Sequence, residues 1–476
     1  MLFATLLAFL TVANCPTGVA FLANTPLTSS ATRANISPVE VLTGVDLSPN
    51  RLGNRVPEPR FKVTVPDSDV CEQTGVTLSR YILENVRANP DLQGIDSIFT
   101  ALQTACKAIS QLVRNSHFND MNGLQDGGGS MNVQGEEQKK LDVVTNDVLK
   151  KALKWSGKFT SLASEEEEDP VPLLDSLGRE VYSGDVVVTA DTNSGYVAVF
   201  DPLDGSSNVD AGIPTGTIFG IFSSEPELKH HSFGNAVNDV QRKCLQSILQ
   251  PGRNLVAAGY CLYSSAVTLV FTLGCGAMGF TLDERIGEFR LTHPHIVIPP
   301  RGKIYSFNEA NRPDWDPALH NYINDLQYGR GQSKQRYTSR YIGSMVADVH
   351  RTLLYGGIFG YPNDTRNPNG KLRLLYEAAP MAFLVEQAGG QAVTGLQRIL
   401  DIVPKSVHQR VPCILGSPED VDECRSYIEQ KSHNDPAITA FCSAQANRPS
   451  QASWAAAAVP GTPCRRQPPP THGRTG

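Results

Sequence analysis

Apolar side chains recur at intervals of three and four residues in three stretches between residues 78 and 152. This spacing places the side chains on one face of an α-helix, so each stretch predicts a helix with a buried face. The apolar positions are Leu78, Ile82 and Val86 in the first stretch, Ile98, Leu102, Cys106, Ile109, Leu112 and Val113 in the second, and Leu141, Val144, Val148 and Ala152 in the third. Asp142 lies at the start of the third predicted helix.

Runs of valine and aromatic residues follow these helical stretches. Residues 186–188 and 197–200 are expected to be strands, because β-branched and aromatic side chains favour a pleated, buried surface. A second set of expected strands and helices extends from about residue 296 to residue 427. This alternation predicts the α/β class with a layered core, divided into an N-terminal α/β domain at 66–296 and a C-terminal α/β domain at 297–432.

Residues 201–208 read DPLDGSSN directly after the second of these strands. Pro202 lacks an N–H group and is expected to end the strand, which would leave Asp201 and Asp204 on a constrained turn. Gly205 permits close approach of the backbone to a ligand. The turn combines two carboxylates with hydroxyl and backbone N–H donors, a set that can hold Mg²⁺ and a phosphate together.

The composition of the 476 residues excludes some classes of protein. With 40% hydrophobic residues and a net charge of −6, the chain is typical of a globular protein with room for two domains. It has no basic patch with interleaved aromatic residues, so no nucleic acid partner is expected. Beyond residue 20 no run predicts a membrane span. The ten cysteines have neither CxxC nor metal-type spacing, which favours thiols in a reducing compartment.

The N-terminus predicts a targeting leader. Residues 1–20 combine an apolar segment with small residues at 18–20, as in a signal peptide, and residues 21–65 are typical of a transit peptide and linker. A leader of this bipartite form resembles those of proteins imported into the stroma of secondary plastids. A plain secretory signal is the alternative, and the cysteine pattern disfavours it. The tail at 433–476 is rich in Ala, Pro, Gln and Ser and is expected to be disordered.

Further acidic residues could join Asp201 and Asp204 in one site: Asp142, the run from Glu165 to Asp169, and Glu377. Each alone is more often a solvated or paired surface charge. Together they suit the cleavage of phosphate esters, since a divalent metal neutralises phosphoryl oxygens and activates water. Lys371 and Arg373 are suited to holding phosphate and are expected on a strand or at a helix start.

These segments resemble the fructose-1,6-bisphosphatase family, within the lithium-sensitive, metal-dependent sugar phosphatases. The resemblance covers about residues 75 to 430. It rests on KKLDVVTND (139–147), SEE (164–166), FDPLDGSSN (200–208), GTIFGIF (216–222), QPGRNLVAAGY (250–260), IYSFNEAN (304–311), RYIGSMVADVHRTLLYGG (340–357) and GKLRLLYEAAPM (370–381). It implies a plastid-type enzyme with a layered α/β/α/β/α fold of two mixed-sheet domains. The implied reaction is Mg²⁺-dependent hydrolysis of the 1-phosphate of fructose 1,6-bisphosphate, in gluconeogenesis or the Calvin cycle.

The resemblance also implies roles for individual residues. The metal ligands, for two or more Mg²⁺ per subunit, would be Glu165, Glu166, Asp201, Asp204, Glu377 and the Leu203 carbonyl. Asp142 and Glu166 would be catalytic by orienting and deprotonating the attacking water, and Glu136 stands where some relatives carry an Asp. The substrate-binding residues would be Asp204, Gly205, Ser206, Ser207 and Arg373 at the reacting phosphate, Met345 at the sugar, Asn308, Tyr341, Tyr361 and Lys371 at the retained phosphate, and Arg340 reaching a neighbouring subunit of a homotetramer.

Two other functions remain open. The chain could act as a sedoheptulose-1,7-bisphosphatase, although residues 350–357 and Tyr361 fit the fructose type better. It could also be a catalytically silent sensor of sugar phosphates, which the retained carboxylates disfavour. The inositol monophosphatases share the DPLDG segment but not the block at 340–381.

The sequence departs from relatives at two regulatory positions. Residues 87–94 and Ser223 differ from the residues that receive AMP in animal members of the family, so weak or absent inhibition by AMP is expected. The long segment between Phe222 and Gln250 contains Cys244 alone, where plastid members place three cysteines. Since a disulfide needs two suitably placed thiols, Cys244 is expected to be a lone thiol rather than part of a redox switch.

Overall fold

The computed structural model describes residues 75–118, 123, 139–173, 195–224 and 239–434. The α-helices in these ranges are α1 (Leu78–Ala88), α2 (Ile95–Arg114), α3 (Lys140–Trp155), α4 (Asp239–Ile248), α5 (Pro317–Tyr328), α6 (Met345–Tyr355), α7 (Ala379–Gln387) and α8 (Pro418–Asn434). The strands are β1 (Phe159–Ser164), β2 (Val171–Pro172), β3 (Tyr196–Asp204), β4 (Thr215–Ser223), β5 (Leu255–Tyr263), β6 (Val267–Thr272), β7 (Ala277–Asp283), β8 (Glu288–Ile296), β9 (Ile304–Phe307), β10 (Thr338–Ser339), β11 (Ile358–Tyr361), β12 (Leu372–Arg373), β13 (Gln391–Val393), β14 (Arg410–Val411) and β15 (Cys413–Gly416).

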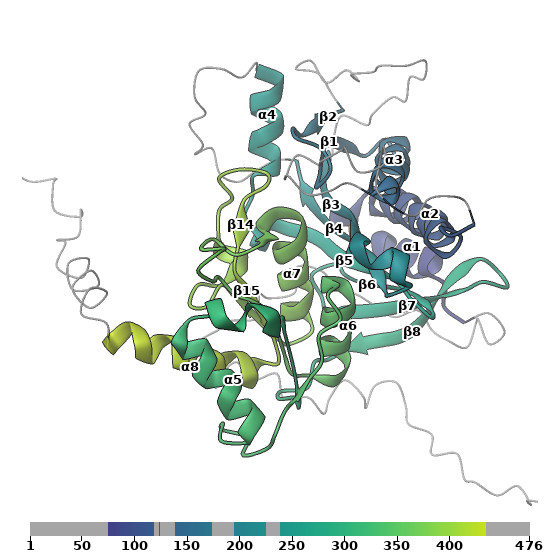
Figure 1. The fold of residues 1–476 in the computed structure, drawn as a ribbon. Helices are drawn as coiled ribbons and strands as arrows, with labels where there is room; N and C mark the ends of the chain where they lie inside the picture. The colour runs from purple at the N-terminus through teal and green to yellow at the C-terminus, as the bar shows by residue number, and fades with distance from the viewer. Residues whose placement is uncertain (1–74, 119–122, 124–138, 174–194, 225–238, 435–476) are drawn as a thin grey trace, which may run out of the picture. The chain divides into compact units, whose positions relative to one another are not determined.

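The three helices expected from the apolar spacing are confirmed as α1, α2 and α3. The helices cover one face of an eight-stranded sheet of order β2-β1-β3-β4-β5-β6-β7-β8 (Figure 1), and the predicted apolar positions of α1 and α2 are buried or partly buried in the core beneath them. The predicted face of α3 was misplaced: Leu141 is buried, but Val144, Val148 and Ala152 are only partly buried. The buried stripe of α3 continues instead through Thr145, Asn146, Leu149 and Leu153. In that sheet β1 and β3 run parallel, and every other neighbouring pair is antiparallel.

Alternating side chains of the large sheet divide it between two cores. In β3, Ala198 and Phe200 pack with the core under α1, α2 and α3, whereas Val197 and Val199 belong to the core on the opposite face. Residues of α6 and α7 fill that second core. Because both faces are covered, β3 is buried along its whole length.

A five-stranded sheet of order β10-β9-β11-β15-β13 forms the next layer. Helices α6 and α7 contact both sheets, and α5 and α8 pack against the outer side of the smaller one in a third core. The order of layers is therefore helices, large sheet, helices, small sheet, helices (Figure 1). This confirms the expected layered α/β/α/β/α class.

One local prediction at the strand end was wrong. Pro202 does not end the strand: β3 continues to Asp204, and its pairing with β4 shifts register between Asp201 and Asp204. The irregularity removes the need for an N–H at Pro202, whose carbonyl instead accepts a hydrogen bond from Thr217 Oγ1 at 2.8 Å. The turn begins at Gly205, with φ at 73°.

Other predictions fall outside the described residues. These are the leader segments at 1–20 and 21–65, the strand at 186–188, Glu136, and the tail from residue 435 onward. Helix α8 includes residues 433 and 434, where the tail was expected to begin. Among the helices that the structure describes, none combines the length and apolar character needed to cross a membrane.

Candidate active site

A cavity of about 540 Å³ opens where β3, α3, α6 and the segment before α7 meet. It is lined by Lys139, Asp142, Glu165, Glu166, Asp201, Leu203, Asp204, Gly205, Ser206, Ser207, Asn308, Tyr341, Gly343, Ser344, Met345, Asp348, Phe359, Tyr361, Lys371, Leu372, Arg373 and Glu377. Every described residue to which the resemblance assigns a metal, catalytic or substrate-binding role lines this cavity except Arg340. Of the acidic run from Glu165 to Asp169, only Glu165 and Glu166 line it. Arg340 is exposed. Its backbone N–H donates to the carbonyl of Tyr305, and its carbonyl accepts a hydrogen bond from the guanidinium of Arg351.

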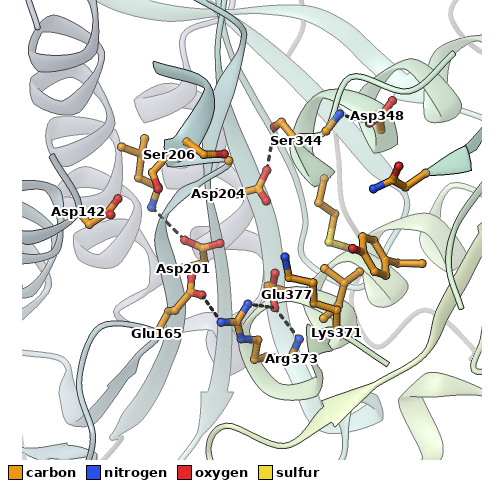
Figure 2. Close-up of a pocket in the computed structure, with 18 of the residues that line it drawn as sticks. Asp142, Glu165, Asp201, Asp204, Ser206, Ser344, Asp348, Lys371, Arg373 and Glu377 are labelled. Atoms are coloured by element: carbon orange, nitrogen blue, oxygen red, sulfur yellow. Dashed lines mark hydrogen bonds and ion pairs between the residues drawn. The ribbon is translucent and has the colours of Figure 1, made fainter. Parts of the chain in front are cut away.

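Three carboxylates converge at the floor of the cavity (Figure 2). Oxygens of Asp201, Asp204 and Glu377 lie within 4.8 Å of one another, and all three residues are buried. Burial, with the nearby charges of Glu165, Asp204 and Glu377, raises the pKa of Asp201 well above its usual range. Burial also raises the pKa of Glu377 to about 8, against the opposing effect of Arg373. These residues fit a divalent cation, which would relieve their mutual repulsion and which binds hard oxygen ligands.

The irregular end of β3 orients the first two carboxylates. Asp201 accepts a hydrogen bond from the N–H of Leu203 at 3.0 Å, which fixes the side chain over its own backbone. Asp204 Oδ2 accepts one from the Ser344 hydroxyl at 2.8 Å and another from the N–H of Val346 at 2.9 Å. Gly205 must be glycine here, because φ is 73° and an added Cβ would lie 2.9 Å from Cβ of Ser344.

A short π-helix at Leu374–Ala378 presents the third carboxylate. Its first turn brings Glu377 Oε2 within 2.5 Å of the backbone N of Arg373, which donates to it. The Arg373 guanidinium lies 3.1 Å from Glu165 and 3.9 Å from Glu377, so it partly neutralises the cluster. Arg373 lies in β12, as expected for a residue on a strand, and Lys371 directly precedes this strand.

Asp142 lies on the opposite wall, in the first turn of α3. The N–H of Lys139 donates to Asp142 Oδ2 at 2.8 Å, which fixes the carboxylate at the helix start. Burial and the charge of Glu166 raise the pKa of Asp142 to about 7, and the hydrogen bond from Lys139 opposes this rise. A carboxylate with a pKa near neutrality is suited to general base catalysis.

The cavity also has a side suited to anions and sugars. Lys371 lies across the carboxylates from Asp142 (Figure 2), and Asn308, Tyr341 and Tyr361 line the same cavity. Amide, phenol and ammonium donors recognise phosphate oxygens. Met345 and Phe359 add apolar surface.

Sequence reasoning missed six lining residues: Lys139, Gly343, Ser344, Asp348, Phe359 and Leu372. Asp348 is fully buried and holds the loop before α6 by accepting from Ser306, Arg351 and the N–H groups at 342–343. Ser344 caps α6 by accepting from the N–H of Ala347 at 3.4 Å. A serine directly before an amphipathic stretch is a helix-start signal that could have identified Ser344.

A buried carboxylate cluster, a carboxylate suited to general base catalysis and a wall with donors suited to anions lie in one cavity of a layered α/β fold, an arrangement typical of the class of metal-dependent phosphatases. Comparison with known protein families identifies the particular family. The family described as "Fructose-1-6-bisphosphatase, N-terminal domain" matches residues 76–294, and "Fructose-1-6-bisphosphatase, C-terminal domain" matches residues 298–429. The chain belongs to the fructose-1,6-bisphosphatase family.

Individual relatives agree with this assignment. The chain is 46% identical over 356 residues to "Fructose-1,6-bisphosphatase, chloroplastic" of Triticum aestivum, covering 75% of this chain and 82% of that relative. It is 49% identical over 333 residues to "Fructose-1,6-bisphosphatase 1, chloroplastic" of Arabidopsis thaliana, covering 70% and 75%. Among solved structures, Leishmania major fructose-1,6-bisphosphatase in holo form matches with a TM-score of 0.64 and 41% identity, covering 75% of this chain and 99% of that one.

Proposed function

We propose that this chain hydrolyses the 1-phosphate of fructose 1,6-bisphosphate to fructose 6-phosphate and inorganic phosphate, as a Mg²⁺-dependent phosphoric monoester hydrolase of carbohydrate metabolism. The observation that carries the proposal is the convergence of Asp201, Asp204 and Glu377 in a cavity that Lys371 also lines. A substrate with two phosphates can place one at the carboxylates and the other at the lysine.

Separate groups of residues would bind the cations and act on the attacking water. Glu165, Glu166, Asp201, Asp204, Glu377 and the Leu203 carbonyl would hold the cations. When bound, Mg²⁺ neutralises phosphoryl oxygens and makes water more acidic. Asp142 accepts the proton of the attacking water, with Glu166 beside it, and the bond from Lys139 keeps the Asp142 carboxylate in place.

The remaining residues orient the substrate. Ser206, Ser207 and Arg373 donate to the reacting phosphate, and Gly205 allows it to approach the backbone. Asn308, Tyr341, Tyr361 and Lys371 bind the retained phosphate, and Met345 packs on the sugar.

We further propose a homotetramer in which Arg340 reaches the site of a neighbouring subunit. Its position outside the cavity of its own chain is compatible with that role.

The relatives and the leader support a location in a plastid. Chloroplastic relatives at 46–49% identity support a plastid enzyme. The leader at residues 1–65 favours import into the stroma of a secondary plastid.

In the described part of the chain, Cys244 is buried on α4 and unbridged, and burial raises the pKa of its thiol. A thiol in this environment is a poor nucleophile, which supports its interpretation as a lone thiol.

Phosphate release from two substrates tests the proposed function. We expect Mg²⁺-dependent release from fructose 1,6-bisphosphate, its loss on chelation with EDTA, and its recovery when Mg²⁺ is restored in excess. Faster release from sedoheptulose 1,7-bisphosphate would assign the chain to the seven-carbon sugar instead. Release from neither substrate, by a protein that binds fructose 1,6-bisphosphate, would make it a sensor.

Lys371→Met is expected to weaken substrate binding more than it slows the chemical step. The substitution keeps an unbranched side chain of similar length and removes a charge on the anion-binding side of the cavity. A charge-assisted hydrogen bond to phosphate contributes roughly 1.5–3 kcal/mol, which corresponds to a rise in KM of about 10- to 150-fold. Steady-state kinetics at saturating Mg²⁺ measure KM for fructose 1,6-bisphosphate. The matched control is Lys151→Met, which makes the same substitution on the exposed face of α3. A KM unchanged within twofold would remove Lys371 from the phosphate site.

A further inference from the structure

His408 connects two segments that carry candidate metal ligands, although it lines no part of the cavity itself. It lies in the loop before β14. On one side its Nδ1 lies 2.8 Å from the hydroxyl of Tyr376, the residue before Glu377. On the other side its Nε2 lies 3.0 Å from the carbonyl oxygen of Glu167 and 3.2 Å from that of Glu168, directly after Glu165 and Glu166.

The two sets of partners determine the tautomer of His408. Carbonyl oxygens only accept hydrogen bonds, so the ring proton lies on Nε2 and is donated to Glu167 and Glu168. Nδ1 is then the acceptor for the Tyr376 hydroxyl. Burial lowers the pKa of His408, which favours this neutral form. The imidazole therefore acts as a rigid link of fixed direction between the π-helix and the loop at 165–168.

The opposite side of that loop is anchored on α3. Asn146 Nδ2 donates to Glu167 Oε1 at 2.8 Å, and Lys150 pairs with the same oxygen. The Ser164 hydroxyl donates to Asn146 Oδ1 at 2.8 Å. With α3 on one side and His408 on the other, the backbone after Glu165 and Glu166 is fixed relative to Glu377.

We infer that His408 is a positioning residue for the metal site, holding the Glu165–Glu166 loop and the Glu377 π-helix at the separation that a divalent cation requires. The inference rests on the proposed function, since it concerns the cation of that reaction. Groups that orient metal ligands without touching the ion typically change metal affinity by about 10- to 100-fold when they are removed.

The fold provides a closely matched control. His350 on α6 makes the same kind of contact with Tyr260 on β5: the hydroxyl lies 2.8 Å from Nδ1, and the ring centroids are 5.8 Å apart. The Tyr376–His408 pair has the same 2.8 Å contact and the same 5.8 Å separation. Neither His350 nor Tyr260 lines the cavity. Replacing either histidine by Phe removes its Tyr–His hydrogen bond, but only His408 connects ligand-bearing segments.

Direct titration with Mn²⁺, followed by electron paramagnetic resonance of the full chain, measures the effect without relying on turnover. We expect His408→Phe to weaken Mn²⁺ binding about 10- to 100-fold and to raise the Mg²⁺ concentration for half-maximal activity by a similar factor. KM for fructose 1,6-bisphosphate at saturating Mg²⁺ should stay within about twofold. His408→Gln, which keeps an N–H donor for the two carbonyls, should recover most of the affinity. His350→Phe should bind Mn²⁺ as the wild type does.

Two results would overturn the inference: wild-type Mn²⁺ affinity in His408→Phe, or equal weakening in His350→Phe, which would indicate a general loss of packing. If His408→Phe shows no cooperative thermal transition, Tyr376→Phe removes one bond of the link and should weaken Mn²⁺ binding severalfold. Unchanged affinity there would also contradict the inference. A wild type that binds Mn²⁺ but releases no phosphate would end the proposed function and leave the His408 measurement valid.

Discussion

Asp142→Asn is expected to lower kcat for fructose 1,6-bisphosphate by about 10²- to 10⁴-fold, the usual contribution of a general base. The amide has nearly the same shape as the carboxylate and cannot take up the proton of the attacking water. It can still accept the hydrogen bond from the Lys139 N–H that is now 2.8 Å long, so the start of α3 should remain intact. KM should therefore change little. Steady-state kinetics and circular dichroism of the same preparation measure both effects.

Asp147→Asn is the matched control, because it makes the same substitution on the same helix. Asp147 pairs with Lys150 at 3.3 Å on the solvent side of α3 and lines no part of the cavity. We expect its kcat within twofold of the wild type. If Asp142→Asn also kept more than a tenth of the wild-type kcat, Asp142 would not be the base, and Glu166 would become the stronger candidate.

Local pattern was sufficient to predict much of the fold. The existence of α1, α2 and α3 follows from spacing alone, because each helix buries one stripe of side chains. Spacing misplaced the stripe of α3, because its buried positions include the polar residues Thr145 and Asn146. The end of β3 was mispredicted for a physical reason. Pro202 does lack an N–H, but the register shift beside it means that no ladder bond is required there. A single strand does not reveal how its partner will pair.

The way the site residues are held in place could not be predicted from local sequence, because it depends on contacts between segments far apart in the chain. Asp204 is held by Ser344 and Val346, about 140 residues further on, and no local signal connects these positions. The motif resemblance found the residues expected to touch metal or substrate. It did not find Asp348 or His408, which act through the backbone of their neighbours. A network of this kind becomes visible only when the two ends of each hydrogen bond are placed in space.

Asp201→Asn is expected to change two properties in opposite directions, raising thermal stability in the absence of divalent cations while abolishing most activity. Burial, together with the charges of the neighbouring carboxylates, raises the pKa of Asp201 well above the usual range, so the ionised side chain destabilises the folded chain relative to the unfolded chain. The amide removes that destabilisation and can keep the 3.0 Å hydrogen bond from the Leu203 N–H. The same change removes a negative charge from the proposed cation site.

Thermal unfolding in EDTA and in excess Mg²⁺ separates the two effects. In EDTA we expect Tm of Asp201→Asn to exceed that of the wild type by about 2 °C or more, the shift produced by roughly 1 kcal/mol in a large domain. Mg²⁺ should raise Tm of the wild type through binding to the folded state, and raise that of the variant much less. Because the metal contributes several kcal/mol to stabilising the transition state, kcat should fall on the order of 10³-fold.

Asp364→Asn distinguishes relief of repulsion from a general effect of removing a buried charge. Asp364 is also buried, but it accepts from the N–H groups of Arg366 and Asn367 at 2.9 and 2.6 Å and lies outside the cavity. The side chain of Asn367 also donates from Nδ2 to Asp364 Oδ2 at 3.2 Å, a bond that an amide nitrogen at that position cannot accept. Asp364→Asn should therefore lower Tm with and without Mg²⁺ while leaving the response to Mg²⁺ unchanged. A fall in Tm for Asp201→Asn in EDTA would show that the carboxylates do not repel one another enough to destabilise the fold. The central argument for a cation at that cluster would then fail, because the cavity would contain no unfavourable charge for the ion to neutralise.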